Sequence, residues 1–77
     1  MPLVSIETQN RIAIVRFDRG YAANPMSLEL IRELTAAARS FEDDFHLSAI
    51  ILTGRQDNFS MGADLKDEAL ANAREVP

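Results

Sequence analysis

The chain has 77 residues, a formal net charge of −4 at pH 7 and no cysteine. A chain of this length forms one small domain at most, and the lack of cysteine excludes disulfides, a thiolate nucleophile and a cysteine-based zinc site. The lone His46 cannot build a metal site, and the acidic balance argues against nucleic acid as a partner. The longest apolar run is four residues, so we expect no membrane contact and a cytoplasmic protein.

The first part of the chain predicts a β-hairpin. Residues 3–7 and 11–17 are rich in β-branched side chains, and the polar residues 8–10 separate them. In the second segment both alternating sets of side chains begin apolar, which is typical of a strand with neighbours on both sides. We therefore predict that residues 11–17 form an interior strand.

A loop and an amphipathic helix follow. Residues 18–25 contain a glycine and an Asn-Pro pair, which favour a loop. Ser27 is placed to cap a helix that begins at Leu28, and apolar side chains then recur every three or four residues to about Asp43–Asp44. The side chains that we expect to pack on the sheet are Ile31, Leu34, Ala38 and Phe41.

The stretch from Ala49 onward predicts a strand, a loop and a second helix. Residues 49–52 are apolar without alternation, which indicates a strand that is buried on both faces of a parallel sheet. Gly62 permits a close backbone approach, and we predict that a helix begins at Ala63 and runs to about Glu75. The free N–H groups of such a helix end would suit an oxyanion. The order β-β-α-β-α gives an α/β fold with this loop at a strand's carboxyl end.

The segment Phe-Ser-Met-Gly-Ala-Asp-Leu-Lys at residues 59–66, preceded by Ile-Ile-Leu-Thr-Gly at 50–54, resembles the oxyanion-hole segment of the enoyl-CoA hydratase/isomerase (crotonase) superfamily. The resemblance implies the N-terminal part of a crotonase-like (ClpP/crotonase) fold, so residues 1–77 would be an incomplete portion of one domain. It also implies that the backbone N–H of Ala63, which follows Gly62, is one of two donors that hold a thioester oxygen.

The resemblance also implies a ligand. The residues expected to contact it lie in the same segment and in the loop before the first helix. The substrate would be an acyl-CoA thioester, with no separate cofactor and no metal. The expected contacts to coenzyme A are Arg19, Asn24, Met61, Ala63, Asp64 and Leu65. The chain departs from the family pattern at Pro25, which replaces a usual alanine, and at residues 22–23, where a basic residue is common.

The resemblance also implies a lyase or isomerase activity in fatty acid metabolism. The family's acid/base carboxylates and its second oxyanion donor have no counterpart in these residues, so we expect the chain alone to be inactive. Family enzymes assemble as trimers or pairs of trimers. The expected partners are therefore the rest of a crotonase domain or further copies of this chain, which would cover the strand at residues 50–52.

An alternative from a different class is a small self-contained α/β interaction module without catalysis. In that hypothesis the loop that contains Gly62 contacts a partner protein instead of a thioester. Pairing of the strand at residues 50–52 separates the two hypotheses, because a self-sufficient module would satisfy that strand within the chain.

Overall fold

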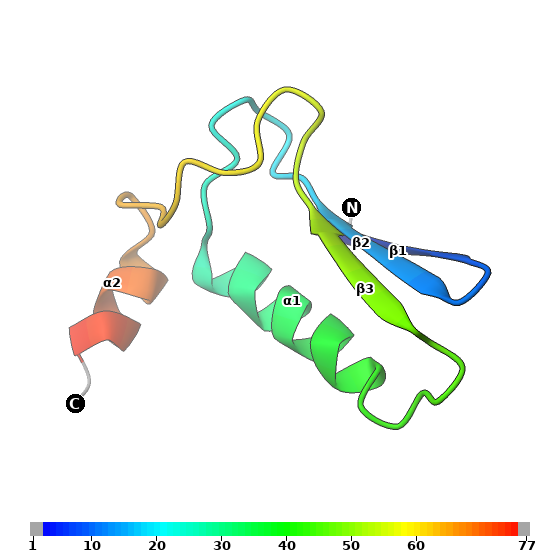
Figure 1. The fold of residues 1–77 in the computed structure, drawn as a ribbon. Helices are drawn as coiled ribbons and strands as arrows, with labels where there is room; N and C mark the ends of the chain where they lie inside the picture. Colours follow the sequence, from blue (N-terminus) through cyan, green and yellow to red (C-terminus); the bar gives the residue numbers. More distant parts are fainter. Residues whose placement is uncertain (1–2, 76–77) are drawn as a thin grey trace.

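The computed structural model describes residues 3–75, which form three strands and two helices in the order β-β-α-β-α (Figure 1). The predicted element order is confirmed. The elements are β1 (Val4–Gln9), β2 (Ile12–Phe17), α1 (Leu28–Ser40), β3 (Ala49–Thr53) and α2 (Glu68–Glu75).

The strands form one mixed sheet in the order β1-β2-β3. β1 runs antiparallel to β2, and β3 runs parallel to β2, so the predicted interior position of β2 is confirmed. The hairpin turn is shorter than predicted, because Gln9 pairs with Ile12 and only two residues connect the strands. Asn10 makes this turn possible with φ = 55°, a left-handed conformation that asparagine adopts more readily than most residues.

Helix α1 begins as predicted but ends earlier. The Ser27 hydroxyl accepts a hydrogen bond from the Leu30 N–H at 3.1 Å, so Ser27 is the N-cap. At the other end the N–H of Phe41 donates to the carbonyl of Ala38 at 3.2 Å, which tightens the last turn before residues 43–44 are reached. Phe45 therefore lies outside the helix and is 87% exposed.

The core lies between α1 and one face of the sheet. Ala13, Val15 and Phe17 from β2 pack under Leu30 and Ala37 of α1, and Leu70 of α2 is buried as well. The predicted helix face is partly wrong, since Ala38 is exposed and Ile31, Leu34 and Phe41 are only half-buried. The reason is the placement of α1, which contacts β1 and β2 and leaves the β3 side of the sheet open.

An apolar cavity of 190 Å³ separates α1 from β3. The predicted burial of residues 49–52 on both faces is wrong, because Ile50, Ile51 and Leu52 are each about half-exposed. β3 is an edge strand with one neighbour in the described part of the chain, and α1 does not reach over it. The residues that line the cavity are Val15, Leu34, Ala37, Ala38, Phe41, Ile50 and Leu52.

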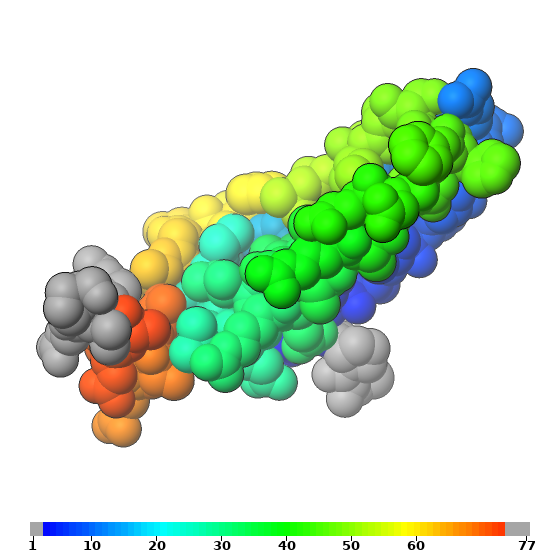
Figure 2. Space-filling model, turned by 90° about the horizontal axis from the view of Figure 1, so that it is seen from below, coloured from blue at the N-terminus to red at the C-terminus, as the bar shows by residue number. Residues whose placement is uncertain are grey.

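Helix α2 begins at Glu68, so the prediction of a helix from Ala63 is wrong. Asp67 accepts a hydrogen bond from the Ala69 N–H at 3.2 Å and thereby caps the helix, whereas Ala63 pairs with Met26 in an isolated β-bridge. α2 lies at one end of the elongated molecule, away from the sheet (Figures 1 and 2). Neither helix, over residues 3–75, has the length and apolar character needed to cross a membrane.

We predict that Leu30→Ala lowers the free energy of unfolding by about 2–5 kcal/mol, because the side chain is fully buried. Leu34→Ala removes a half-buried side chain and should lower it by clearly less. Leu65→Ala is the control, because Leu65 is 86% exposed and the change should stay within about 0.5 kcal/mol. Urea denaturation followed by circular dichroism measures all three, and equal losses for Leu30 and Leu34 would contradict this core.

Candidate functional site

The loops that follow β2 and β3 meet at one end of the sheet (Figure 1). Because β2 and β3 are parallel, their carboxyl ends lie at the same edge, where α/β sheets commonly bind ligands. Residues 18–27 form the first loop and residues 54–67 form the second, and both carry residues that the sequence singles out.

Gly54 lets the second loop fold back on itself. A Cβ at this position would lie 2.7 Å from the Cα of Phe59, closer than real Cβ atoms come to backbone. Phe59 in turn packs edge-on against the buried ring of Phe17, with 5.1 Å between the ring centres. The loop is therefore held against the end of β2.

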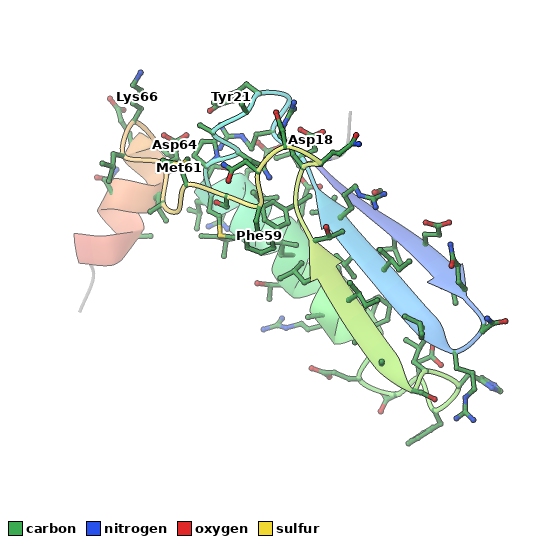
Figure 3. The ribbon with its side chains drawn as sticks, turned by 45° about the horizontal axis from the view of Figure 1, so that its top comes forward. Asp18, Tyr21, Phe59, Met61, Asp64 and Lys66 are labelled. Carbon is green, nitrogen blue, oxygen red and sulfur yellow. The ribbon has the colours of Figure 1, made fainter. Side chains whose placement is uncertain are left out.

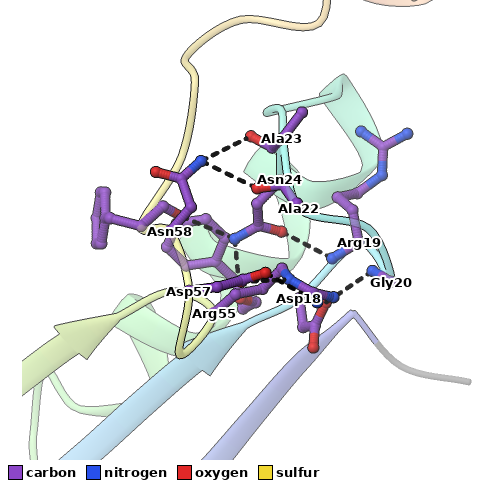
Figure 4. Close-up of polar contacts among 11 residues, drawn as sticks. Asp18, Arg19, Gly20, Ala22, Ala23, Asn24, Arg55, Asp57 and Asn58 are labelled. Carbon is purple, nitrogen blue, oxygen red and sulfur yellow. Dashed lines mark hydrogen bonds and ion pairs between the residues drawn. The ribbon is translucent and has the colours of Figure 1, made fainter.

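Asn24 joins the two loops through its buried side-chain amide (Figure 4). Its Oδ1 accepts a hydrogen bond from the Arg19 N–H at 2.8 Å. Its Nδ2 donates to the carbonyls of Phe17 at 3.2 Å and of Phe59 at 2.7 Å. The residue adopts φ = 43° before Pro25, outside the right-handed α region as the Asn-Pro pair predicts. A contact between Asn24 and coenzyme A stays a prediction.

Ala63 lies in a parallel bridge to Met26. The Met26 N–H donates to the Gly62 carbonyl at 2.8 Å, and the Asp64 N–H donates to the Met26 carbonyl at 2.9 Å. In such a bridge both bonds use the residues that flank Ala63, so its own N–H points away from Met26. Within residues 3–75 this N–H has no hydrogen-bond acceptor, and Ala63 is exposed. Gly62 makes the preceding turn at φ = 100°, a conformation that favours glycine.

Apolar side chains flank the Ala63 N–H in the chain. Met61 is 75% exposed and Leu65 is largely exposed as well, so neither side chain contributes to the core. In Figure 3 Met61 and Asp64 lie on the stretch that leads from the loop after β3 toward α2, with Lys66 beyond them. Along this stretch the N–H groups of Ala63 and Leu65 have no acceptor within the described residues, and the role of the predicted site residues stays a prediction.

Arg19 connects the first loop to this stretch. Its guanidinium donates to the Pro25 carbonyl at 2.9 Å and forms an ion pair with the Asp64 carboxylate at 3.3 Å. The same group lies 5.7 Å from the ring centre of Tyr21. The sequence placed Arg19 and Asp64 among the coenzyme A contacts, which stays a prediction, but it did not indicate that they pair with each other.

A polar groove of 660 Å³ lies between this ion pair and the first turn of α1. Asp67 borders it and accepts the Leu28 N–H at 2.8 Å, so one carboxylate caps both helices. Sequence analysis missed Asp67, although an aspartate just before a run of helix formers is an N-cap signal. The lining residues are Arg19, Ser27, Leu28, Glu29, Arg32, Glu33, Ala36, Asp64, Asp67 and Ala69.

A second ion cluster holds the outer side of the two loops (Figure 4). Arg55 contacts Asp57 at 2.9 Å and Asp18 at 3.0 Å. The hydrogen bond from the Gly20 N–H, followed by that from Arg55, holds the pKa of Asp18 below its ordinary value, whereas the pKa of Asp57 is lowered mainly by Arg55. Both carboxylates thus favour their charged forms in the folded chain.

We predict that Arg55→Met raises the pKa of Asp57 more than that of Asp18, because Asp18 keeps its bond from Gly20. A pKa that is lower in the folded chain than its ordinary value of 3.8 stabilises the fold at pH values above 3.8. This contribution is lost as the pH falls through the folded-state pKa. Carboxyl ¹³C NMR titration measures both groups. The control is Arg11→Met, which removes a cation that within residues 3–75 bonds only to the His46 carbonyl. Equal shifts of the two aspartates would contradict the prediction.

The family model described as enoyl-CoA hydratase/isomerase matches residues 7–75. A probable enoyl-CoA hydratase of Rhizobium meliloti is 39% identical over 80% of this chain and 24% of its own length. A 4-chlorobenzoyl coenzyme A dehalogenase of an Arthrobacter species is 34% identical over 95% of this chain and 26% of its own length.

Solved structures show the same fold. The enoyl-CoA hydratase of Mycobacterium tuberculosis H37Rv superposes with a TM-score of 0.79 at 31% identity, covering 88% of this chain and 31% of the solved one. An enoyl-CoA hydratase/isomerase from Xanthobacter autotrophicus Py2 gives 0.78 at 32% identity, over 95% of this chain and 26% of the solved one. The chain thus spans about a quarter of the length of the curated relatives described above.

Proposed function

This chain belongs to the enoyl-CoA hydratase/isomerase family, and we propose that it forms part of an acyl-CoA site in which the Ala63 N–H binds the thioester carbonyl oxygen. The observation that carries the proposal is the Ala63 N–H, which points away from the bridge to Met26 and has no acceptor within residues 3–75. A donor of this kind stabilises an oxygen on which negative charge develops, because it is already oriented before the reaction.

The neighbours of Ala63 support a thioester rather than a bare anion as the ligand. Met61 and Leu65 present exposed apolar surface on either side of Ala63, which suits an acyl chain or the arm that carries the thioester. Gly62 adds no side chain, and nothing lies within 4 Å of where its Cβ would be. We propose that Arg19, Asn24 and Asp64 serve the ligand through the loops that they hold.

The family and the names of the relatives support a CoA thioester as the substrate class. The names of the relatives include hydratases and a dehalogenase, and the substrates in those names are CoA thioesters. We propose that residues 1–77 contribute one oxyanion donor to such a domain, without a further cofactor, and that the second donor and the acid/base carboxylates come from outside these residues. We therefore expect no hydration of crotonyl-CoA by the 77-residue chain alone.

We predict that the Ala63 amide proton shifts downfield in ¹H–¹⁵N NMR when butyryl-CoA is added, and not when coenzyme A without an acyl group is added. The reason is that only the thioester offers the carbonyl oxygen. In a synthetic chain whose Ala63 N–H is replaced by an ester oxygen, the dissociation constant for butyryl-CoA should rise about fivefold to tenfold, since one hydrogen bond is lost.

The matched control is the same ester replacement at Gln56, an exposed residue on the outer turn of the same loop, whose N–H also has no acceptor within the described residues. This variant should bind butyryl-CoA as the unmodified chain does. An Ala63 amide that responds equally to coenzyme A and butyryl-CoA, or an ester at residue 63 without effect on binding, would refute the proposed donor.

We further propose that the open side of β3 is a contact with the rest of a crotonase domain or with another copy of the chain, in the cytoplasm. Ile50 and Leu52 face the cavity beside α1, while Ile51 lies on the opposite face next to Ile14 of β2. An edge strand with apolar side chains on both faces recruits other chains, because its unpaired backbone groups and its apolar surface are otherwise exposed to water.

We predict that the 77-residue chain self-associates at micromolar concentration in analytical ultracentrifugation, and that Ile51→Glu shifts it toward monomer. Ile51 is the choice because it lies away from α1, so the charge leaves the core intact. Ser5→Glu, which places the same charge on the same face at the opposite edge strand, is the control. A monomer of the unmodified chain over this range, or equal effects of both substitutions, would disprove the contact.

A further inference from the structure

Arg19 contacts both backbone segments of the bridge that holds Ala63. Pro25, whose carbonyl Arg19 binds, directly precedes Met26 on one side of the bridge. Asp64, whose carboxylate Arg19 binds through both terminal nitrogens at 3.3 Å, directly follows Ala63 on the other side. One guanidinium therefore spans the two segments whose relative position decides where the Ala63 N–H points.

The ion pair is well shielded. The side chains of Arg19 and Asp64 are 19% and 14% exposed, so screening by water is weaker than for a surface pair. The backbone N–H of Arg19 is itself fixed by Asn24, and its guanidinium lies over the ring of Tyr21. The position of Arg19 is thus set from three directions before any ligand arrives.

The ion pair between Arg19 and Asp64 also determines the charge beside Ala63. Asp64 is the next residue after the proposed oxyanion donor, and an unpaired carboxylate there would oppose negative charge on a bound oxygen. Its pairing with Arg19 removes that opposition and at the same time ties down the backbone at Asp64. Lysine could not replace arginine fully, because one ammonium group lacks the planar fork of donors that reaches a carboxylate and a carbonyl together.

We propose that Arg19 is a positioning residue for the Ala63 N–H, acting through Pro25 and Asp64 and neutralising Asp64 beside the developing charge. This inference rests on the proposed function of Ala63. It assigns to Arg19 a role in aiming the donor, in place of the direct contact to coenzyme A that the sequence indicates.

The experiment compares Arg19→Met and Arg19→Lys in the full 77-residue chain, with Arg32→Met as the matched control. Arg32 lines the same groove but forms no ion pair within the described residues. The first readout is hydrogen exchange of the Asp64 amide, which reports the bond to Met26 without any ligand. The second is the downfield shift of the Ala63 amide on addition of butyryl-CoA, with coenzyme A as the reference probe.

In Arg19→Met we expect hydrogen exchange of the Asp64 amide to accelerate roughly tenfold, as for the loss of a charge-assisted hydrogen bond. Hydrogen exchange of the amides that bond β2 to β3 should be unchanged. The Ala63 response to butyryl-CoA should be lost, although coenzyme A binds as before. Arg19→Lys should restore part of both effects, and Arg32→Met should resemble the unmodified chain. A purely structural role would alter exchange and leave the thioester response intact.

The outcomes separate the two proposals. An Arg19→Met chain that keeps both the slow exchange at Asp64 and the Ala63 response overturns the role of Arg19 and leaves the function of Ala63 standing. An unmodified chain whose Ala63 amide ignores butyryl-CoA overturns the proposed function itself. If Arg19→Met does not fold, Asp64→Asn decides, because it removes the charge and keeps an oxygen acceptor. Its Ala63 response should weaken, and an undiminished response overturns the inference.

Discussion

The side-chain amide of Asn24 is the interaction on which the functional end of this fold depends. It satisfies the carbonyl at the end of β2, the N–H of Arg19 and the carbonyl of Phe59 with a single buried group. Buried polar groups of this kind are costly when they are left unpaired, at about 1–3 kcal/mol each, so the three segments are held together as one unit. The bridge between Met26 and Ala63, and with it the direction of the Ala63 N–H, builds on this arrangement.

Much of the fold could be predicted from the sequence because local signals and packing agree. β-branched residues form β1 and β2, and Ser27 caps α1. The burial of β3 could not be predicted correctly. An unbroken apolar run indicates that a strand is suited to burial on both faces. The described residues, however, supply β3 with only one neighbouring strand, and the helix beside it lies over β1 and β2.

For the candidate site, the sequence indicated which residues to consider but predicted the wrong local structure. The resemblance singles out Gly62 and Ala63, but the physical reason that the sequence suggested, a helix end at Ala63, is wrong. Within residues 3–75 the Ala63 N–H has no acceptor, because a parallel bridge uses the residues on either side of it. Such long-range pairings, like those of Arg19 with Asp64 and of Asp67 with Leu28, leave no periodic trace in the sequence, since their partners are far apart along the chain.

Gly54 helps to restrict where the second loop can change length during evolution. The loop is held at its start, where Gly54 fits beneath the backbone of Phe59, and again where the Met61 N–H donates to the Ala23 carbonyl at 2.9 Å. Between these points only Gln56 and Asp57 are exposed polar residues on the outer turn. Inserted residues can bulge outward there without displacing Ala63, whereas an insertion after Phe59 would shift the register of the bridge. Natural length variation in related chains should therefore concentrate at this outer turn.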